Sequence, residues 1–170
     1  MSMTAADIAL PDRVELAETP GSGGLPAAPG TGGLSVLVTT VVSDSHTWNL
    51  VFLQLALEEL GHDVRNLGPC VPPDEVVAEC LRARPDLVVV STVNGHGLRD
   101  GSYLIGLLRA VPELADLPVV IGGKLGIAGP AAQDHSARLR AAGYDAIFED
   151  GAGIAALGSL SELVAAGRQA

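Results

Sequence analysis

From Leu34 onward, short apolar segments rich in β-branched residues alternate with segments of helical periodicity, and this alternation restricts the chain to few folds. Five of the apolar segments are predicted strands: Ser35–Val42, Asp63–Leu67, Leu87–Val90, Val119–Ile121 and Ala146–Phe148. Their centres are roughly 25 to 30 residues apart, which is about the length of one strand plus one crossover helix. Strands of this kind are typical of a parallel sheet that is covered on both faces.

Helices are predicted between and after these strands, because apolar residues recur there at helical spacing. They are Trp48–Leu60, Asp74–Ala83, Leu98–Val111, Pro130–Ala142 and Gly153–Ala166. Since crossovers between parallel strands are right-handed, few topologies remain, and the order 2-1-3-4-5 is the commonest choice for this length. We therefore expect a single α/β domain of the flavodoxin-like (Rossmann-type) class, with a doubly wound, five-stranded parallel sheet.

The first 33 residues differ in composition from the rest of the chain, with six glycines, four prolines, four acidic residues and one arginine. A segment of this kind buries too little apolar surface to offset the entropy lost on ordering. We expect residues 1–33 to form a disordered Gly/Pro-rich tail and residues 34–170 to form the folded domain.

The formal net charge is −10, and the basic residues are scattered singly, which argues against binding of nucleic acid. No run of about 18 apolar residues could span a membrane, and the N-terminus lacks the positive start of a secretory signal. A cytoplasmic location is therefore expected. Cys70 and Cys80 fit no zinc-binding pattern and are expected to remain thiols in that reducing setting.

Polar residues and glycines follow the predicted strands at the edge where their carboxyl ends meet. In such sheets, ligands bind beyond this edge, at the switch point between the first and third strands. The segments concerned are Ser43–Asn49, Ser91–Gly97, Gly122–Gly126 and Glu149–Gly153. Glycine there permits a large flat ligand to approach the backbone closely.

Asp44 and His46 are the candidate metal-binding pair at this edge. A carboxylate beside an imidazole fixes the tautomer of the imidazole and raises the basicity of its free nitrogen toward a metal. Taken by itself, the spacing also fits a helix cap followed by a solvated loop histidine. His62 and His135 lie in polar segments and are expected to have no special role. His96 lies in the loop after the third strand, where a contact with a substrate or another subunit is the alternative to the plain loop role that we expect.

Other kinds of protein with this fold need residues at this edge that the chain lacks. A receiver domain needs an Asp after the third strand and a Lys after the fifth, where this chain has Ser91 and Glu149–Asp150. A flavin carrier needs a glycine-rich phosphate loop after the first strand and aromatic walls, but the chain has only 3% aromatic residues. Neither a Rossmann glycine fingerprint nor a P-loop is present.

Together, Asp44-x-His46, Ser91-x-Val93 and Gly122-Gly123 resemble the signature Asp-x-His-x-x-Gly, Ser-x-Leu, Gly-Gly of cobalamin-binding domains. The chain is most similar to the small, cobalamin-binding subunit of glutamate mutase (methylaspartate mutase), over about Leu34 to Leu157. Two further stretches, Asn66–Gly68 and Gly143–Asp145, also look like that subunit.

The resemblance implies a role for individual residues. His46 would replace the cofactor's dimethylbenzimidazole as the lower ligand of cobalt, and Asp44 would accept a hydrogen bond from its other ring nitrogen. Ser91 would bond the displaced base, while Gly122 and Gly123 would leave room for the nucleotide tail. The remaining residues expected at the cofactor are Ser43, Ser45, Thr47, Thr92, Val93, Gly95, Lys124, Leu125 and Gly126.

Departures from the family pattern lie near the metal ligand. Asn49 stands where the pattern has Gly, so the loop loses the freedom of glycine there, and Val93 replaces Leu. Trp48 could pack against the ligand or staple the following helix, and we expect the staple. Lys124, the only lysine, is expected either to meet the tail's sugar or phosphate or to be simply exposed.

The resemblance further implies an isomerase subunit that carries adenosylcobalamin. A separate large catalytic subunit with a barrel fold would hold the amino-acid substrate, in a heterotetramer that interconverts glutamate and 3-methylaspartate by radical isomerisation. A corrinoid methyl carrier and a stand-alone cobalamin-binding or sensing module are the alternatives. The first usually has a helical cap before the domain, and the second is normally fused to an output domain.

Overall fold

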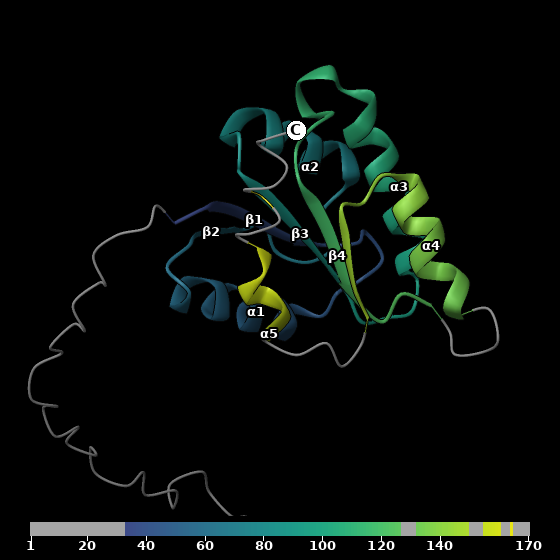
Figure 1. The fold of residues 1–170 in the computed structure, drawn as a ribbon, viewed down its shortest axis with the longest axis horizontal. Helices are drawn as coiled ribbons and strands as arrows, with labels where there is room; N and C mark the ends of the chain where they lie inside the picture. Colours follow the sequence, from purple (N-terminus) through teal and green to yellow (C-terminus); the bar gives the residue numbers. More distant parts are fainter. Residues whose placement is uncertain (1–32, 127–131, 150–154, 161–163, 165–170) are drawn as a thin grey trace, which may run out of the picture.

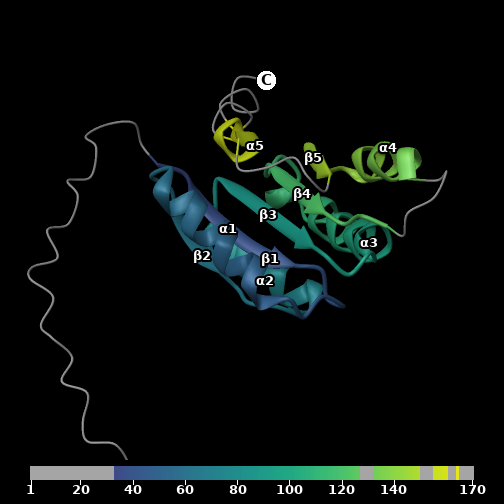
Figure 2. The ribbon, with the colours of Figure 1, turned by 90° about the horizontal axis from the view of Figure 1, so that it is seen from below.

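The computed structural model describes residues 33–126, 132–149, 155–160 and 164. Within them, five parallel strands form one sheet in the order β2-β1-β3-β4-β5. The strands are β1 (Ser35–Thr40), β2 (Asp63–Asn66), β3 (Leu87–Thr92), β4 (Val119–Gly123) and β5 (Ala146–Glu149). Figure 2 shows them following one another across the twisted sheet. The predicted flavodoxin-like class and strand order are confirmed.

The helices lie close to their predicted positions. They are α1 (Thr47–Glu59), α2 (Pro73–Ala83), α3 (Gly97–Ala110), the 3₁₀ helix η1 (Pro112–Leu114), α4 (Ala132–Ala142) and α5 (Ala155–Gly158). Of the expected tail, all but Gly33 lies outside the described residues, as do Pro130 and much of the last predicted helix.

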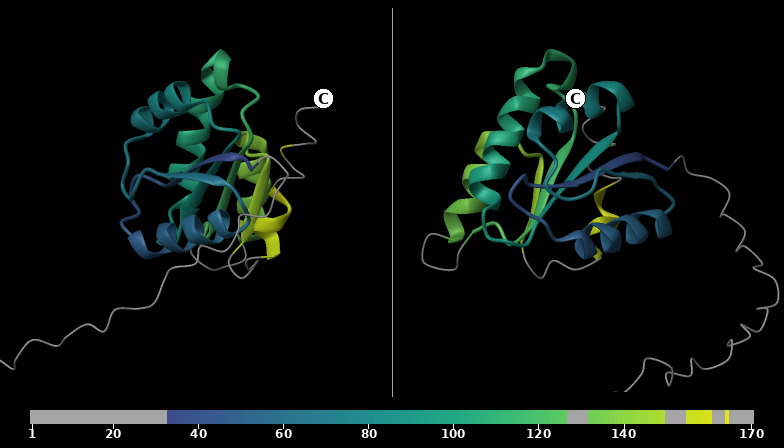
Figure 3. Two further views of the ribbon diagram at one scale, coloured as in Figure 1. Left: turned by 90° about the vertical axis from the view of Figure 1, so that its left-hand side faces the viewer. Right: turned by 180° about the vertical axis from the view of Figure 1, so that it is seen from behind.

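Helices cover both faces of the sheet (Figure 3). An apolar core lies on each face and holds the layers together. Successive residues of a strand point to opposite faces, so Val36 and Val38 join the core under α1 and α5, whereas Leu37 joins the other core. Figure 1 shows α1 and α5 on one side of the sheet and α2 and α3 on the other. Because both faces are covered, the central strands β1, β3 and β4 carry runs of buried apolar residues, whereas the edge strand β2 alternates between exposed and partly buried residues.

Strand ends differ from prediction in a way that shapes the edge of the sheet. β1 leaves the sheet two residues early because the Asp44 amide donates to the carbonyl of Val41 at 2.9 Å and closes a turn. β3 and β4 run two residues further than predicted, to Thr92 and Gly123, which pair with each other in register.

Helix α1 is apolar on its outer face as well as its inner face. Leu50, Ala56 and Leu57 are buried against the sheet. Four further apolar side chains are exposed to solvent: Trp48, Val51, Phe52 and Leu55. Trp48 is 65% exposed, so the expectation that it staples the helix is wrong.

Both cysteines carry free thiols, with Cys80 buried and Cys70 exposed. Within the described part of the chain, no helix is both long enough and apolar enough to cross a membrane.

Candidate functional site

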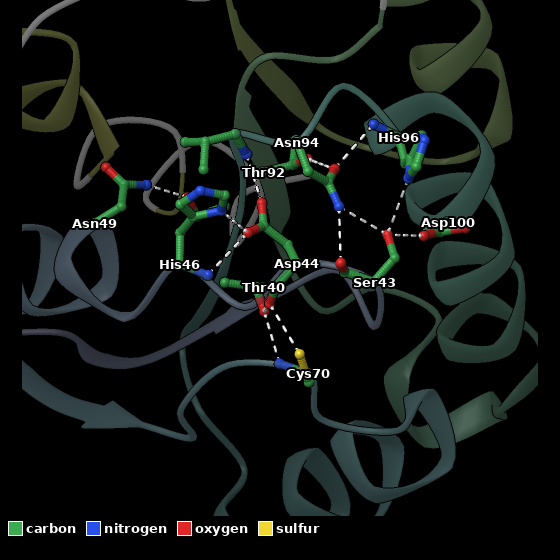
Figure 4. A network of polar contacts seen from close by, with 12 residues as sticks. Thr40, Ser43, Asp44, His46, Asn49, Cys70, Thr92, Asn94, His96 and Asp100 are labelled. Carbon is green, nitrogen blue, oxygen red and sulfur yellow. Dashed lines mark hydrogen bonds and ion pairs between the residues drawn. The ribbon is translucent and has the colours of Figure 1, made fainter.

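The turn after β1 fixes the position of Asp44 by its backbone. The carbonyl of Asp44 accepts hydrogen bonds from the Thr40 hydroxyl at 3.0 Å and from the Cys70 amide at 3.1 Å. The Cys70 thiol also donates to this oxygen, at 3.3 Å. Contacts from β1 and from the loop before α2 therefore hold the Asp44 main chain at the carboxyl edge of the sheet (Figure 4).

The carboxylate of Asp44 is 1% exposed and has a partner on each oxygen. Oδ2 accepts from the Val93 amide at 2.6 Å, which links the loop after β1 to the loop after β3. Oδ1 accepts from the His46 amide at 3.0 Å. Burial raises the pKa of Asp44, but the hydrogen bonds from Val93 and His46 outweigh burial, so the pKa lies below its usual value. Asp44 is therefore a fixed carboxylate at neutral pH.

His46 lies directly before α1, and its side chain is 47% exposed. Its Nδ1 lies 2.7 Å from Oδ1 of Asp44. Since a carboxylate accepts, Nδ1 of the neutral ring carries the proton, and the lone pair is on Nε2. Nε2 makes no hydrogen bond with the described residues. This arrangement offers one oriented, basic imidazole nitrogen as a metal ligand.

No group of three or more His, Cys, Asp or Glu side chains that could hold a metal ion occurs among the residues that the structure describes. Of these described residues, His46 would offer a metal one ligand nitrogen. Macrocyclic cofactors suit a site of this kind, because the ring would supply the other donors.

A second set of polar contacts lies beside the pair and joins β1 to α3 (Figure 4). The Asn94 amide donates at 2.9 Å to both the carbonyl and the hydroxyl of Ser43, and its oxygen accepts from the His96 amide at 2.9 Å. The Ser43 hydroxyl also donates to Asp100, in the first turn of α3. The Arg99 guanidinium beside Asp100 holds the pKa of that carboxyl below its usual value, against the opposing effect of burial.

Ser91 is near the end of β3 and is 3% exposed. Its hydroxyl oxygen accepts a hydrogen bond from the Asn49 side chain, in the first turn of α1. The predicted motif residue therefore contacts the very residue that departs from the family pattern.

The glycine pair of β4 lies beside Ser91 and Thr92, in register with them. Gly123 has φ +101°, and a Cβ there would be 2.1 Å from the carbonyl oxygen of Thr92. A Cβ on Gly122 would be 3.1 Å from the carbonyl oxygen of Phe148. Gly123 is therefore required by the close packing of the sheet itself, and Gly122 is tightly packed, besides any space that the pair leaves for a ligand.

The segment after β4 is tied to its neighbours by main-chain hydrogen bonds. The Lys124 amide donates to the Thr92 carbonyl at 2.7 Å, and the Leu125 carbonyl accepts from the Leu98 amide at 2.8 Å. The Lys124 side chain is exposed, and Gly126 packs against the ring of His135. The Lys124 amide is therefore already used within the fold.

The predicted residues thus gather at one edge, but they do not all make contacts. Asp44, His46 and Val93 are joined directly, and Ser43 belongs to the neighbouring network. Ser45 and Thr47 are exposed, and Gly95 is buried with φ +83°.

Three residues at this edge were not predicted as site residues: Asn49, Asn94 and Asp100. Asn94 lies two residues after the end of β3, and this place in the sequence could have signalled it. Asp100 gives no such signal, because it looks like an ordinary acidic residue in the first turn of a helix.

Comparison with known proteins adds independent findings. Residues 34–157 match the family described as B12 binding domain. The glutamate mutase sigma subunit of Fusobacterium nucleatum is 28% identical over 118 residues, covering 68% of this chain and 85% of the relative. The sigma subunit of Halobacterium salinarum is 29% identical over 123 residues, covering 72% and 81%. The structure of a cobalamin-binding protein from Desulfitobacterium hafniense superposes with a TM-score of 0.60 at 25% identity, covering 78% of this chain and 59% of that one.

Proposed function

This chain belongs to the B12-binding domain family, and we propose that it is the cobalamin-carrying subunit of an adenosylcobalamin-dependent mutase that interconverts glutamate and 3-methylaspartate. The observation that carries the proposal is the Asp44–His46 pair, at 2.7 Å, on the carboxyl edge of the sheet. The similarity to glutamate mutase sigma subunits, over about two thirds of the chain, supports the choice of reaction.

The donor set fits a corrinoid. A corrin ring would supply the other nitrogen ligands of cobalt, so the protein would need to supply one nitrogen. His46 has a half-exposed ring, and its Nε2 makes no hydrogen bond with the described residues. In the proposal, His46 would hold the cobalt through Nε2. Asp44 keeps the proton on Nδ1 and so raises the basicity of the ligating nitrogen. The Val93 amide in turn keeps Asp44 in place.

Residues between the sheet and its neighbouring helices would hold the nucleotide tail of the cofactor. In this proposal, Ser91 binds the base, and Gly122 and Gly123 provide the low wall beside it. Around the corrin and tail we propose the other edge residues named from the sequence: Ser43, Ser45, Thr47, Thr92, Val93, Gly95, Lys124, Leu125 and Gly126.

Adenosylcobalamin, when bound, supplies the radical chemistry of the carbon-skeleton rearrangement. The residues of this chain hold and orient the cofactor and contribute no further catalytic group. We propose that a large catalytic subunit of barrel fold holds the amino-acid substrate and excludes water, in a heterotetramer with this chain.

Binding of cobalamin by the purified chain tests the central step. Wild-type protein is expected to bind cobalamin in a form in which a histidine nitrogen replaces the cofactor's own dimethylbenzimidazole on cobalt. In the cobalt(II) form, ¹⁵N-labelling of histidine should then change the nitrogen splitting of the EPR signal. His46→Ala should abolish that change, and His62→Ala, at a histidine in the loop between α1 and β2, should preserve it. An unchanged spectrum in His46→Ala would overturn the assignment.

Reconstitution tests the reaction. Mixed with a glutamate mutase large subunit and adenosylcobalamin, the chain is expected to support formation of 3-methylaspartate from glutamate. Cobalamin binding without turnover, together with methyl transfer to a partner protein, would favour the corrinoid methyl carrier instead.

A further inference from the structure

A hydrogen bond joins helix α1 to strand β3 at the proposed tail site. Asn49 lies in the first turn of α1, and its side-chain Nδ2 donates to the hydroxyl oxygen of Ser91. Asn49 is partly buried and Ser91 is almost completely buried, so solvent competes little for either group.

In this contact, Asn49 is the donor and the Ser91 hydroxyl is the acceptor. A serine hydroxyl has one donor and two acceptor lone pairs. The Asn49 amide occupies the acceptor side of Ser91, and the hydroxyl proton has no acceptor among the residues that the structure describes. A buried donor without an acceptor is costly, and a ligand that brings an acceptor removes that cost.

We propose that Asn49 is a positioning residue that, by holding the oxygen of Ser91, commits the Ser91 hydroxyl to donate to an acceptor nitrogen of the cofactor's nucleotide base. The inference rests on the proposed function and deepens it. Glycine, which the family pattern has at this place, has no side-chain amide that could donate to Ser91. The chain would therefore bind the tail through a two-residue relay rather than through Ser91 alone.

Reversing the polarity of residue 49 tests the inference. Asn49→Asp is nearly isosteric, but its carboxylate can only accept, so the Ser91 hydroxyl donates its hydrogen bond to residue 49 and presents only its oxygen lone pairs to the base. Affinity for cobalamin, measured by absorbance titration at neutral pH, is expected to fall about fivefold to tenfold. Asn49→Ala, which frees the Ser91 hydroxyl to rotate, should lose less than Asn49→Asp.

Three controls separate this role from added charge, from effects away from the nucleotide tail and from loss of structure. Gln54→Glu adds the same charge to α1 at a residue that bonds Glu58 and Asn66 instead of Ser91, and it should leave cobalamin affinity unchanged. Cobinamide, which lacks the nucleotide tail, should bind equally well to wild type, Asn49→Asp and Asn49→Ala. Circular dichroism and melting temperature identify any variant that has lost its fold.

A double-mutant cycle shows whether Asn49 acts through Ser91. In the Ser91→Ala background, Asn49→Asp should weaken cobalamin binding by less than twofold. An equal loss in both backgrounds would overturn the inference, as would an equal loss of cobinamide affinity or unchanged or tighter binding of cobalamin by Asn49→Asp. Failure of the wild-type chain to bind cobalamin at all would instead count against the proposed function.

Discussion

At the scale of single residues, the two cysteines have opposite surroundings. Burial raises the pKa of the Cys80 thiol to about 12, so almost no reactive thiolate forms there at moderate pH. Cys70 is exposed, in a left-handed conformation with φ 56°. We predict that a disulfide reagent such as Ellman's reagent at about pH 8 modifies Cys70 and spares Cys80 in the folded protein. The Cys70→Ser variant should then show no fast reaction with the reagent. Unfolding in urea should make the thiol of Cys80 reactive. Rapid reaction of two thiols in the folded chain would contradict the burial of Cys80.

The sequence was informative about residues whose role follows from local spacing. Asp44 and His46 are two positions apart on one turn, so their contact could be predicted from the chain alone. The contact of Asn49 with Ser91 spans 42 positions and depends on how α1 lies against β3. The same holds for Ser43 with Asp100, 57 positions apart, because no local pattern records which distant side chain completes a hydrogen bond.

At the scale of strands, the end of β4 tolerates no side chain. Gly123 combines φ +101° with a carbonyl oxygen 2.1 Å from the place of a Cβ. We predict that Gly123→Ala lowers the free energy of unfolding by about 2–4 kcal/mol. Gly106, within α3, has nothing within 4 Å of its Cβ position, so Gly106→Ala should raise that free energy by about 0.5–1 kcal/mol. Urea denaturation of both variants measures the difference. Similar stability of the two variants would show that the backbone at Gly123 can relax.

At the scale of helices, Arg109 connects α3 to two other parts of the chain. Its side chain is 20% exposed and donates to oxygens on both sides: the carbonyls of Leu114, Ala115, Leu117 and Gly143 and the carboxylate of Asp145. Arg109→Met leaves these carbonyls without their donor, and we predict a loss of about 2–4 kcal/mol in the free energy of unfolding. Arg109→Lys should recover less than half of it, because an ammonium group cannot span the same oxygens.

The matched control is Arg82→Lys on α2, where the arginine is exposed and pairs with Glu79 on the same helix. Its stability should change little. A full rescue by Arg109→Lys would mean that charge rather than the planar guanidinium holds η1 and the start of β5.

The helices and strands could be predicted from the periodicity of apolar residues, but the residues at which they end could not. The apolar run predicted β3 only to Val90, since Ser91 and Thr92 are polar, yet pairing with Gly122 and Gly123 extends the strand. Polar residues at a strand end are ambiguous in sequence because they fit a loop and a functional edge equally well. The two extra pairs are what brings Ser91 beside the glycines of β4.

At the scale of the whole molecule, an acid-sensitive contact fastens the loop after β1 to α3. The pKa of Asp100 is held below its usual value, first by Arg99 and then by Ser43, with His96 nearby. A carboxyl with a lowered folded-state pKa stabilises the fold above its unfolded pKa of about 3.9 and loses that contribution as the pH falls through the folded value. We predict that the melting temperature of the wild-type protein decreases when the pH is lowered below about 4. Asp100→Asn should be less stable than wild type at pH 7, but its melting temperature should decrease less on acidification. Equal slopes in both proteins would assign the acid sensitivity to other carboxyls.

The sheet order and the edge where the predicted site residues meet could be predicted because both follow from general rules for parallel sheets. The outer face of α1 could not. Helical periodicity distinguishes an apolar face from a polar one, and α1 is apolar on both, so the pattern did not show which side chains remain exposed.

The exposed position of Trp48 makes it a built-in optical probe of the site. It is the only tryptophan, it lies two residues from His46, and it is 65% exposed. Corrinoids absorb where indole emits, so a corrinoid bound at His46 should quench nearly all of the tryptophan emission by energy transfer. Titrating cobalamin against this emission measures affinity with no label, and unchanged emission at saturating cobalamin would contradict binding at this edge. Loading of the cofactor could thus be followed in real time by a reporter that the chain already carries.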